Sequence, residues 1–119
     1  MRKAMKLVMA ASVVALVMSV TITPATAVAG DVEEGKVIAF DRQKGNCLAC
    51  HAIEGGSLPG NIGPPLVQMK SRFPDKAKLR DQIFDPTRNN PNTIMPPFGK
   101  LDLLTAEELR KVVEFVYSL

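Results

Sequence analysis

The stretch Cys47-Leu48-Ala49-Cys50-His51 has the spacing C-x-x-C-H, and it contains both cysteines and the single histidine of the 119-residue chain. Two thiols at this spacing can form thioethers with the two vinyl groups of one haem, and the adjacent histidine can then bind the iron through Nε2. We therefore predict one covalent haem c, attached through Cys47 and Cys50, with His51 as the proximal iron ligand.

The sequence gives less support to three other uses of the motif. A structural zinc site needs four ligands and a catalytic one three protein ligands, so the motif would also need a nearby carboxylate. A thiol oxidoreductase with a redox-active C-x-x-C is the more serious alternative. In that class the motif lies next to a βαβ unit, and the sequence has no strand pattern that could form one. A small disulfide loop beside an unligated histidine is the third.

The N-terminus has the organisation of a secretory signal peptide. Three basic residues precede an apolar region, residues 7–20, which is followed by small residues that suit signal peptidase. We expect cleavage after Ala27 or Ala29, which divides the chain into a signal peptide, 1–29, and a monohaem cytochrome domain, 30–119. An uncleaved anchor stays open, although fourteen residues are short for a membrane span. The prediction is a periplasmic protein with no membrane attachment after cleavage.

The positive net charge of the chain comes from the predicted signal peptide. Three of the 15 basic residues and none of the 12 acidic ones lie in residues 1–29, so the remainder has 12 of each. The net charge of +3 therefore belongs to the precursor. Because nucleic-acid binding needs a basic surface that displaces counterions, we expect no nucleic-acid partner.

The composition predicts a small all-α domain built around its cofactor. The 90 residues that follow Ala29 would form a marginal core alone, and the chain has five Phe, one Tyr and no Trp. A buried haem would enlarge that core. Helical patterns joined by proline- and glycine-rich loops indicate a first helix that Asp31 and Glu34 cap and that runs to about Lys44. They also indicate a helix from Pro65 to Arg72 and one from an Asp75 cap to Phe84.

The last segment carries the clearest helical signal. Thr105-x-x-Glu108 is a capping box, and apolar residues then recur at helical spacing. We expect this stripe to pack on the first helix near Gly35 and Phe40. The stripe consists of Leu109, Val112, Val113, Val116 and Tyr117.

The sixth iron ligand has few candidates, because Met69 and Met95 are the only methionines outside the signal region. Met69 lies in an expected helix, where packing explains it. Met95 precedes Pro96-Pro97, which stiffen the backbone. We expect Met95 as the distal ligand, with Met69, a lysine or no ligand left open. His–Met ligation raises the reduction potential and leaves no position for a substrate, which favours electron transfer.

The order of these features resembles the class I cytochromes c. The haem motif follows a first helix, Gly63-Pro64 lies downstream, a loop supplies the methionine, and a helix closes the chain. The resemblance implies a small all-α class I cytochrome c fold with helices around the haem. It also implies that the carbonyl of Pro64 accepts the Nδ1 proton of His51 and so orients the imidazole.

Four stretches narrow the resemblance to SoxX, the small monohaem cytochrome family of bacterial sulfur oxidation. They are residues 45–53, 58–66, 72–75 and 90–99. The resemblance implies a non-catalytic electron-transfer subunit of SoxAX, an L-cysteine S-thiosulfotransferase that couples thiosulfate to a cysteine of the SoxYZ carrier. In that family SoxA, a dihaem or monohaem cytochrome, forms the heterodimer partner and carries the catalytic haem, while SoxX passes electrons toward a soluble cytochrome.

A second function stays open at this point. The same haem residues would serve a free periplasmic electron carrier that delivers electrons to a terminal oxidase and belongs to no enzyme complex.

Overall fold

The computed structural model describes residues 24–119, and most of the predicted signal peptide, residues 1–23, lies outside the described residues. Within the described range the regular structure is entirely helical, with no strand. The helices are α1 (Pro24–Phe40), η1 (Cys47–Ala49), α2 (Met69–Arg72), α3 (Lys76–Phe84), η2 (Pro86–Arg88) and α4 (Ala106–Ser118).

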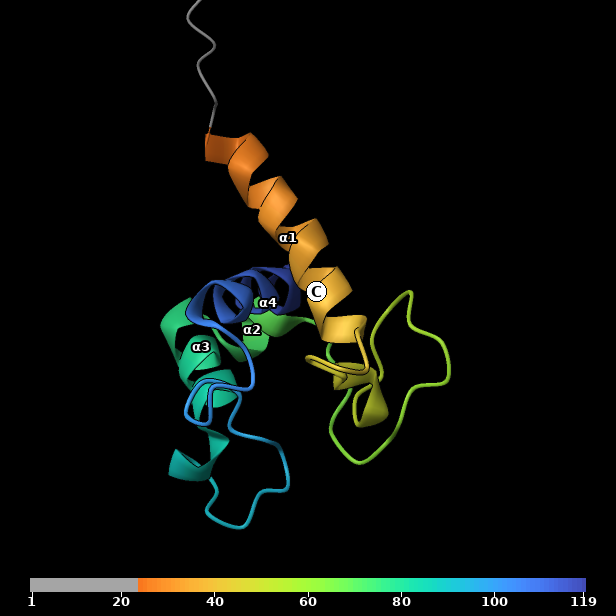
Figure 1. Ribbon diagram of the computed structural model, residues 1–119, viewed down its shortest axis with the longest axis vertical. Coiled ribbons are helices and arrows are strands. Elements are labelled where there is room, and N and C mark those ends of the chain that lie inside the picture. The colour runs from red at the N-terminus through yellow and green to blue at the C-terminus, as the bar shows by residue number, and fades with distance from the viewer. Residues whose placement is uncertain (1–23) are drawn as a thin grey trace, which may run out of the picture.

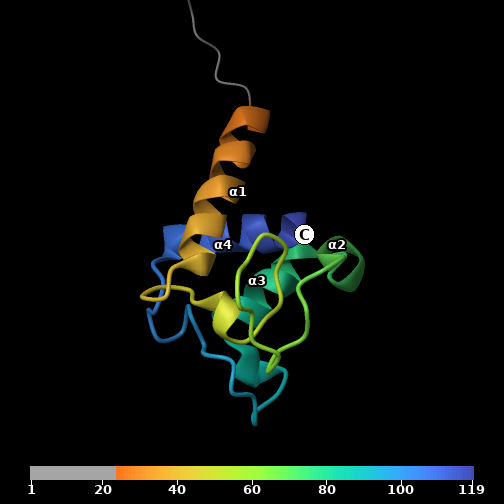
Figure 2. The same cartoon turned by 90° about the vertical axis from the view of Figure 1, so that its right-hand side faces the viewer.

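Helices α1 and α4 cross and form the main packing contact of the fold (Figures 1 and 2). At Gly35 a Cβ atom would lie 2.0 Å from the carbonyl oxygen of Lys111 and 2.9 Å from the Phe115 Cβ, so only glycine permits this approach. The ring of Phe40 packs edge-to-face on Phe115, with centroids 5.8 Å apart. The predicted contact of the two helices at Gly35 and Phe40 is confirmed.

The α4 residues that meet Gly35 lie outside the predicted stripe. They are Lys111 and Phe115, which the prediction did not include. Val112 and Val116 are buried, as expected of a core-facing stripe, and they also line a cavity. Because Phe115 is buried as well, the apolar face of α4 is wider than the predicted stripe.

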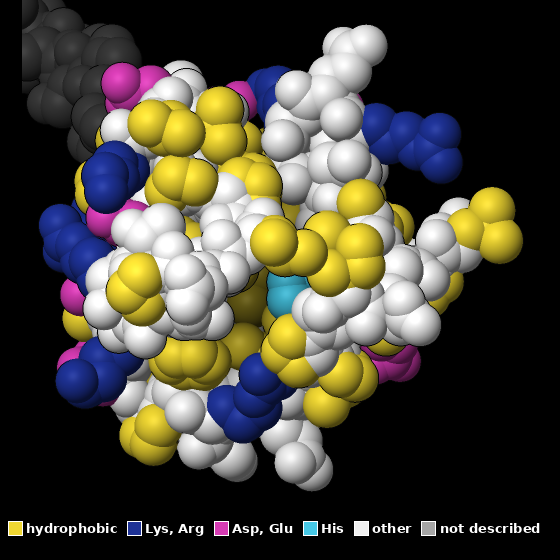
Figure 3. All heavy atoms as spheres, turned by 90° about the horizontal axis from the view of Figure 1, so that it is seen from below, with side chains coloured by type: hydrophobic (Ala, Val, Ile, Leu, Met, Phe, Trp, Pro, Cys, Tyr) yellow, Lys and Arg dark blue, Asp and Glu magenta, His cyan; other side chains and the backbone are white. Residues whose placement is uncertain are grey.

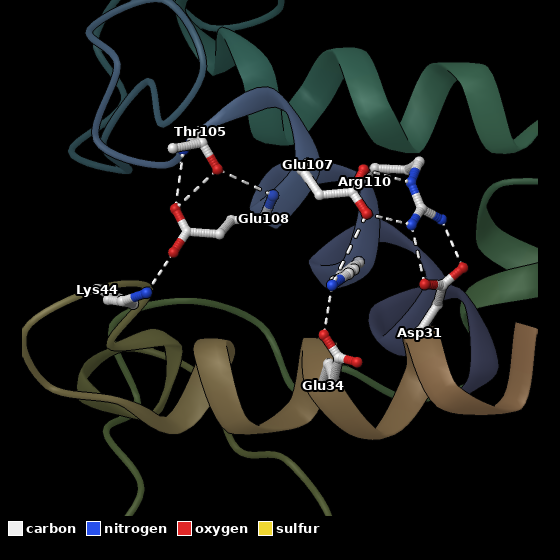
Figure 4. A network of polar contacts seen from close by, with 8 residues as sticks. Asp31, Glu34, Lys44, Thr105, Glu107, Glu108 and Arg110 are labelled. Carbon is white, nitrogen blue, oxygen red and sulfur yellow. Dashed lines mark hydrogen bonds and ion pairs between the residues drawn. The ribbon is translucent and has the colours of Figure 1, made fainter. Parts of the chain in front are cut away.

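Ion pairs reinforce the α1–α4 contact (Figure 4). Arg110 donates to both carboxylate oxygens of Asp31, at 2.5 and 2.8 Å, and this hydrogen bonding lowers the pKa of Asp31. Lys111 pairs with Glu34. Each of these pairs involves α1 residues from position 31 onward, so they lie within the domain that the predicted cleavage would leave.

The prediction that Asp31 caps the first helix is wrong. Helix α1 already begins at Pro24, a residue whose fixed φ suits the first helical position, and Asp31 lies inside the helix with its side chain turned to Arg110. The predicted end near Lys44 is also too late. The helix ends at Phe40, because Asp41 forms a turn in which its side chain accepts from the Gln43 amide at 2.8 Å.

The three later helices were predicted with unequal success. The short helix expected from Pro65 begins only at Met69, because Gln68 adopts a left-handed conformation with φ 52°. Asp75 caps α3 as expected, accepting from the Ala77 amide at 2.9 Å. The capping box of α4 is present, with Thr105 and Glu108 each accepting from the backbone of the other.

The core is a single cluster of buried apolar side chains to which α1, α3 and α4 all contribute. The most buried core residues are Ala39, Met69, Leu79, Leu104, Leu109, Val112 and Val116.

None of the helices between residues 24 and 119 has both the length and the apolar composition needed to cross a membrane.

Candidate functional site

A cavity of about 600 Å³ lies between the haem motif, the loop that follows it, and helices α3 and α4. Figure 3 looks into this hollow: the imidazole of the single histidine is visible in it, bordered by hydrophobic side chains. Its apolar walls are the type of environment that encloses a macrocycle. The lining includes Cys47, Cys50, His51, Pro64, Leu79, Ile83, Met95, Phe98, Val112 and Val116.

The haem motif is folded into one tight turn. Cys47–Ala49 form η1, and the amides of Cys50 and His51 both donate to the Cys47 carbonyl, at 3.2 and 2.9 Å. The turn begins at Asn46, which adopts a left-handed conformation with φ 47°. This turn brings both thiols and the imidazole to the same cavity.

The loop after the motif packs directly on it through Gly60. Its amide donates to the Leu48 carbonyl at 2.7 Å, and a Cβ at this position would lie 2.0 Å from the Ala49 carbonyl oxygen. The absence of a side chain therefore lets the two backbones touch.

His51 is held from two sides. Its Nδ1 lies 2.6 Å from the Pro64 carbonyl oxygen, and because a carbonyl can only accept, Nδ1 carries the proton. Nε2 is then left with a lone pair that can bind a metal. On the other side the ring packs on Gly63, where a Cβ would lie 2.4 Å from Cε1. The position and tautomer of the imidazole both suit a proximal iron ligand.

Cys47 does not have the lowered pKa of a redox-active C-x-x-C thiol. Both cysteines are free in the structure, and burial raises the pKa of the Cys47 thiol to about 11. A nucleophilic C-x-x-C cysteine has a lowered pKa, because the thiolate is the reactive form. The burial of Cys47 beside an apolar cavity suits a thioether instead.

Both candidate methionines line the cavity, but their surroundings differ. Met69 is 2% exposed, and its sulfur accepts from the Arg72 guanidinium at 3.3 Å. Met95 is partly buried, and its amide donates to the hydroxyl of Thr93, two residues earlier, at 3.2 Å. The Met69 sulfur thus already has a partner from its own helix, whereas Met95 is carried into the cavity by a loop.

These residues fit a covalent haem c. Two thiols at the required spacing, one imidazole with a free Nε2 lone pair and a thioether from another segment surround one apolar cavity.

Comparison with known proteins places the chain in a family. Residues 31–116 match the family described as "Cytochrome C oxidase, cbb3-type, subunit III". The chain belongs to this family. The covalent haem c predicted from the motif therefore agrees with the family to which this cytochrome domain belongs.

A solved structure extends the comparison to the fold. The crystal structure of SoxXA from P. pantotrophus matches with a TM-score of 0.67 and 29% identity, covering 72% of this chain and 79% of that chain. This similarity confirms the predicted resemblance to SoxX and the small all-α class I cytochrome c fold.

A bacterial lipoprotein also matches part of the chain. An "Uncharacterized lipoprotein" of Aquifex aeolicus (strain VF5) is 34% identical over 77 residues, which cover 64% of this chain. The match spans 37% of the length of that relative.

Sequence reasoning missed two residues that shape the site. Arg72, which was not expected to contact the site, donates to the Met69 sulfur and to the Pro65 carbonyl, the latter at 2.8 Å. Asp85 is buried near the loop that carries Met95. An acidic residue directly before a proline at a helix end was the only signal for Asp85, and such residues commonly cap turns.

Proposed function

We propose that this chain is the electron-transfer subunit of a periplasmic SoxAX-like L-cysteine S-thiosulfotransferase. The observation that carries the proposal is the similarity to the SoxXA structure over 72% of the chain. The haem motif and the loop methionine lie within the same domain. The proposed partners are a SoxA-type cytochrome in a heterodimer, a SoxYZ-type carrier as the substrate of the complex, and a soluble cytochrome as electron acceptor.

The proposed iron ligands are His51 and Met95. The haem, when bound, supplies one reversible one-electron centre. His51 offers Nε2 because the Pro64 carbonyl fixes its tautomer, and Met95 offers a thioether whose sulfur has no hydrogen-bond donor among the described residues. With His51 and Met95 both holding the iron, the site would transfer electrons and would leave no position for a substrate.

The division of labour in the proposed complex follows from the cysteines. Coupling thiosulfate to a carrier thiol forms one S–S bond and releases one proton and two electrons. A sulfur nucleophile on the enzyme would require a free thiol, but both thiols of this chain would be thioethers. The sulfur chemistry therefore belongs to the partner, and this chain receives the electrons one at a time and passes them to the soluble cytochrome.

A periplasmic location is part of the proposal. The signal-like N-terminus supports it, and Asp31 and Glu34, the α1 residues that form ion pairs with α4, lie after both predicted cleavage sites. Removal of residues 1–29 would leave these contacts intact.

The alternative function is a free carrier that delivers electrons to a terminal oxidase. The family description names a cytochrome oxidase, which supports delivery of electrons toward an oxidase but says nothing for a carrier outside any complex. The alternative differs from the first proposal in predicting no lasting complex.

Reconstitution separates the two functions. The haem-loaded protein alone should accept and donate electrons but should not modify a SoxYZ-type carrier with thiosulfate. Adding a SoxA-type partner should produce coupling. Coupling by the isolated chain would contradict the proposal, and full coupling by the partner with its acceptor but without this chain would favour the free carrier.

A further inference from the structure

Asp85 is the one buried charged residue in the described part of the chain. It lies between α3 and η2 and is 3% exposed. Because burying a carboxylate is costly unless it is paired, its partners indicate what it holds together.

Two of its partners are local and one is distant. The Thr87 hydroxyl donates to Oδ1 at 2.5 Å, and Arg88 Nε lies 3.6 Å from Oδ2. The third partner is Lys100, whose Nζ lies 3.0 Å from Oδ2. The hydrogen bonds from Thr87 and Lys100 lower the pKa of Asp85, so the carboxyl is ionised at neutral pH.

Lys100 lies at the far end of the loop that contains Met95. The loop leaves η2 after Arg88, and its return is fixed where the amides of Gly99 and Lys100 both donate to the Phe84 carbonyl at 3.1 Å. Gly99 packs on the Phe84 ring so closely that a Cβ would lie 2.0 Å from Cδ2. Phe84 and Asp85 thus hold both ends of the loop, the segment that hangs below α3 in Figure 1.

The interior of the loop has few hydrogen bonds to the rest of the protein, although Phe98 is buried in the core. Between residues 90 and 98 each hydrogen bond among the described residues stays within the segment 86–104. Pro96 and Pro97 have no amide proton to contribute. The position of Met95 therefore depends on local turns, on packing and on how firmly the two ends are joined.

We propose that Asp85 is a positioning residue that closes the Met95 loop through Lys100 and thereby keeps Met95 in the haem cavity. This inference rests on the proposed role of Met95 as the distal ligand. Phe84 contributes through its backbone carbonyl and its ring, whereas Asp85 and Lys100 form the ion pair that joins the two ends of the loop.

The test measures how easily imidazole displaces the distal ligand of the oxidised haem protein. Imidazole can bind only when Met95 is away from the iron, so its apparent affinity rises in proportion to the open population. Asp85→Asn keeps the shape of the side chain and removes its charge. We expect this variant and Lys100→Gln each to bind imidazole about tenfold more tightly, as loss of a charge-assisted hydrogen bond would allow.

Two controls separate positioning from general destabilisation. Asp81→Asn, at an exposed position on α3 that pairs only with neighbouring Arg80, should keep wild-type imidazole affinity. The double variant Asp85→Asn/Lys100→Gln should bind no more tightly than either single variant, because both remove the same link. The denaturant midpoint of Lys100→Gln should fall only slightly, because Thr87 and Arg88 still pair with the buried Asp85 carboxylate.

The outcomes also separate this inference from the ligand assignment. Wild-type imidazole affinity in Lys100→Gln would overturn the positioning role, and this variant decides alone if Asp85→Asn fails to fold. Met95→Leu should bind imidazole more tightly than the other variants. If it instead keeps wild-type affinity, Met95 is not the ligand, and the basis of the inference fails with it.

Discussion

The carbonyl oxygen of Pro64 lies 2.6 Å from Nδ1 of His51, and this hydrogen bond determines which imidazole nitrogen is free. Because the carbonyl accepts the Nδ1 proton, the Nε2 lone pair remains available to a metal. Gly63, the residue before Pro64, packs on the ring itself. One dipeptide therefore sets both the tautomer and the position of the proposed proximal ligand.

Gly63→Ala tests this arrangement. A Cβ would lie 2.4 Å from Cε1 of His51, so the ring or the loop must shift, and we expect a stability loss of about 1–3 kcal/mol with a lower yield of haem-loaded protein. Absorbance per polypeptide and thermal unfolding measure both effects. Gly30→Ala is the matched control, since a Cβ there meets nothing within 4 Å. Equal yields from the two variants would contradict the steric role of Gly63.

Met95→Leu tests the distal ligand. The oxidised wild-type protein should show the weak far-red sulfur-to-iron absorbance band, and Met95→Leu should abolish it and lower the reduction potential. Met69→Leu should keep the band, because the Met69 sulfur is engaged by Arg72. The volume-conserving change at Met69 should cost less than about 1.5 kcal/mol of stability. The reverse pattern would assign the ligand to Met69.

The residues that gather at the cavity could largely be predicted, because the patterns that indicate them are local in sequence. The motif, the capping box and the proline-flanked Met95 need no knowledge of distant contacts. The errors concern where helices begin: α1 starts at Pro24, so that Asp31 lies inside it and pairs with Arg110, and Gln68 takes a left-handed conformation that delays α2. No local pattern in the sequence could indicate the pairing of Asp31 with Arg110 or the left-handed conformation of Gln68.

The same limit applies to the support of the site. The pairing of Asp85 with Lys100 joins residues on either side of an irregular loop, and the contact of Arg72 with Met69 depends on where a four-residue helix begins. Such contacts follow from the folded geometry, because neither residue type nor spacing specifies them.

Gly35→Val tests the helix crossing. The new side chain would overlap the Lys111 carbonyl, so we expect a loss of about 1–3 kcal/mol of stability. Chemical denaturation of the haem-loaded protein measures it. Val37→Ala, two residues further on the same helix at a side chain that is 69% exposed, should change stability by less than about 0.5 kcal/mol. A wild-type denaturation midpoint for Gly35→Val would contradict the close approach.

Glu108 predicts a specific pH dependence of stability. A hydrogen bond from Lys44, followed by those from Thr105, lowers the pKa of Glu108 from 4.5 to about 2. A group whose pKa is lowered by folding stabilises the protein above its unfolded pKa, and this contribution is lost as the pH falls from about 4.5 to about 2. The stability difference between wild type and Glu108→Gln should therefore be full at neutral pH and shrink across this range.

Denaturant titrations at several pH values measure that difference. Glu33→Gln, at an exposed position on α1, is the control and should differ little from wild type throughout. A difference between wild type and Glu108→Gln that stays constant down to about pH 3 would contradict the assigned role of the Lys44 and Thr105 hydrogen bonds.

Native purification tests the proposed function most directly. The protein is isolated from its source without a tag, and haem absorbance, polypeptide mass and co-eluting proteins are recorded at each step. We predict that it elutes with a second c-type cytochrome in equal amounts, and that the purified complex couples thiosulfate to a carrier thiol while its haem becomes reduced. Elution of the haem protein alone, with no lasting partner and no reduction by thiosulfate plus carrier, would contradict the account and leave a free electron carrier.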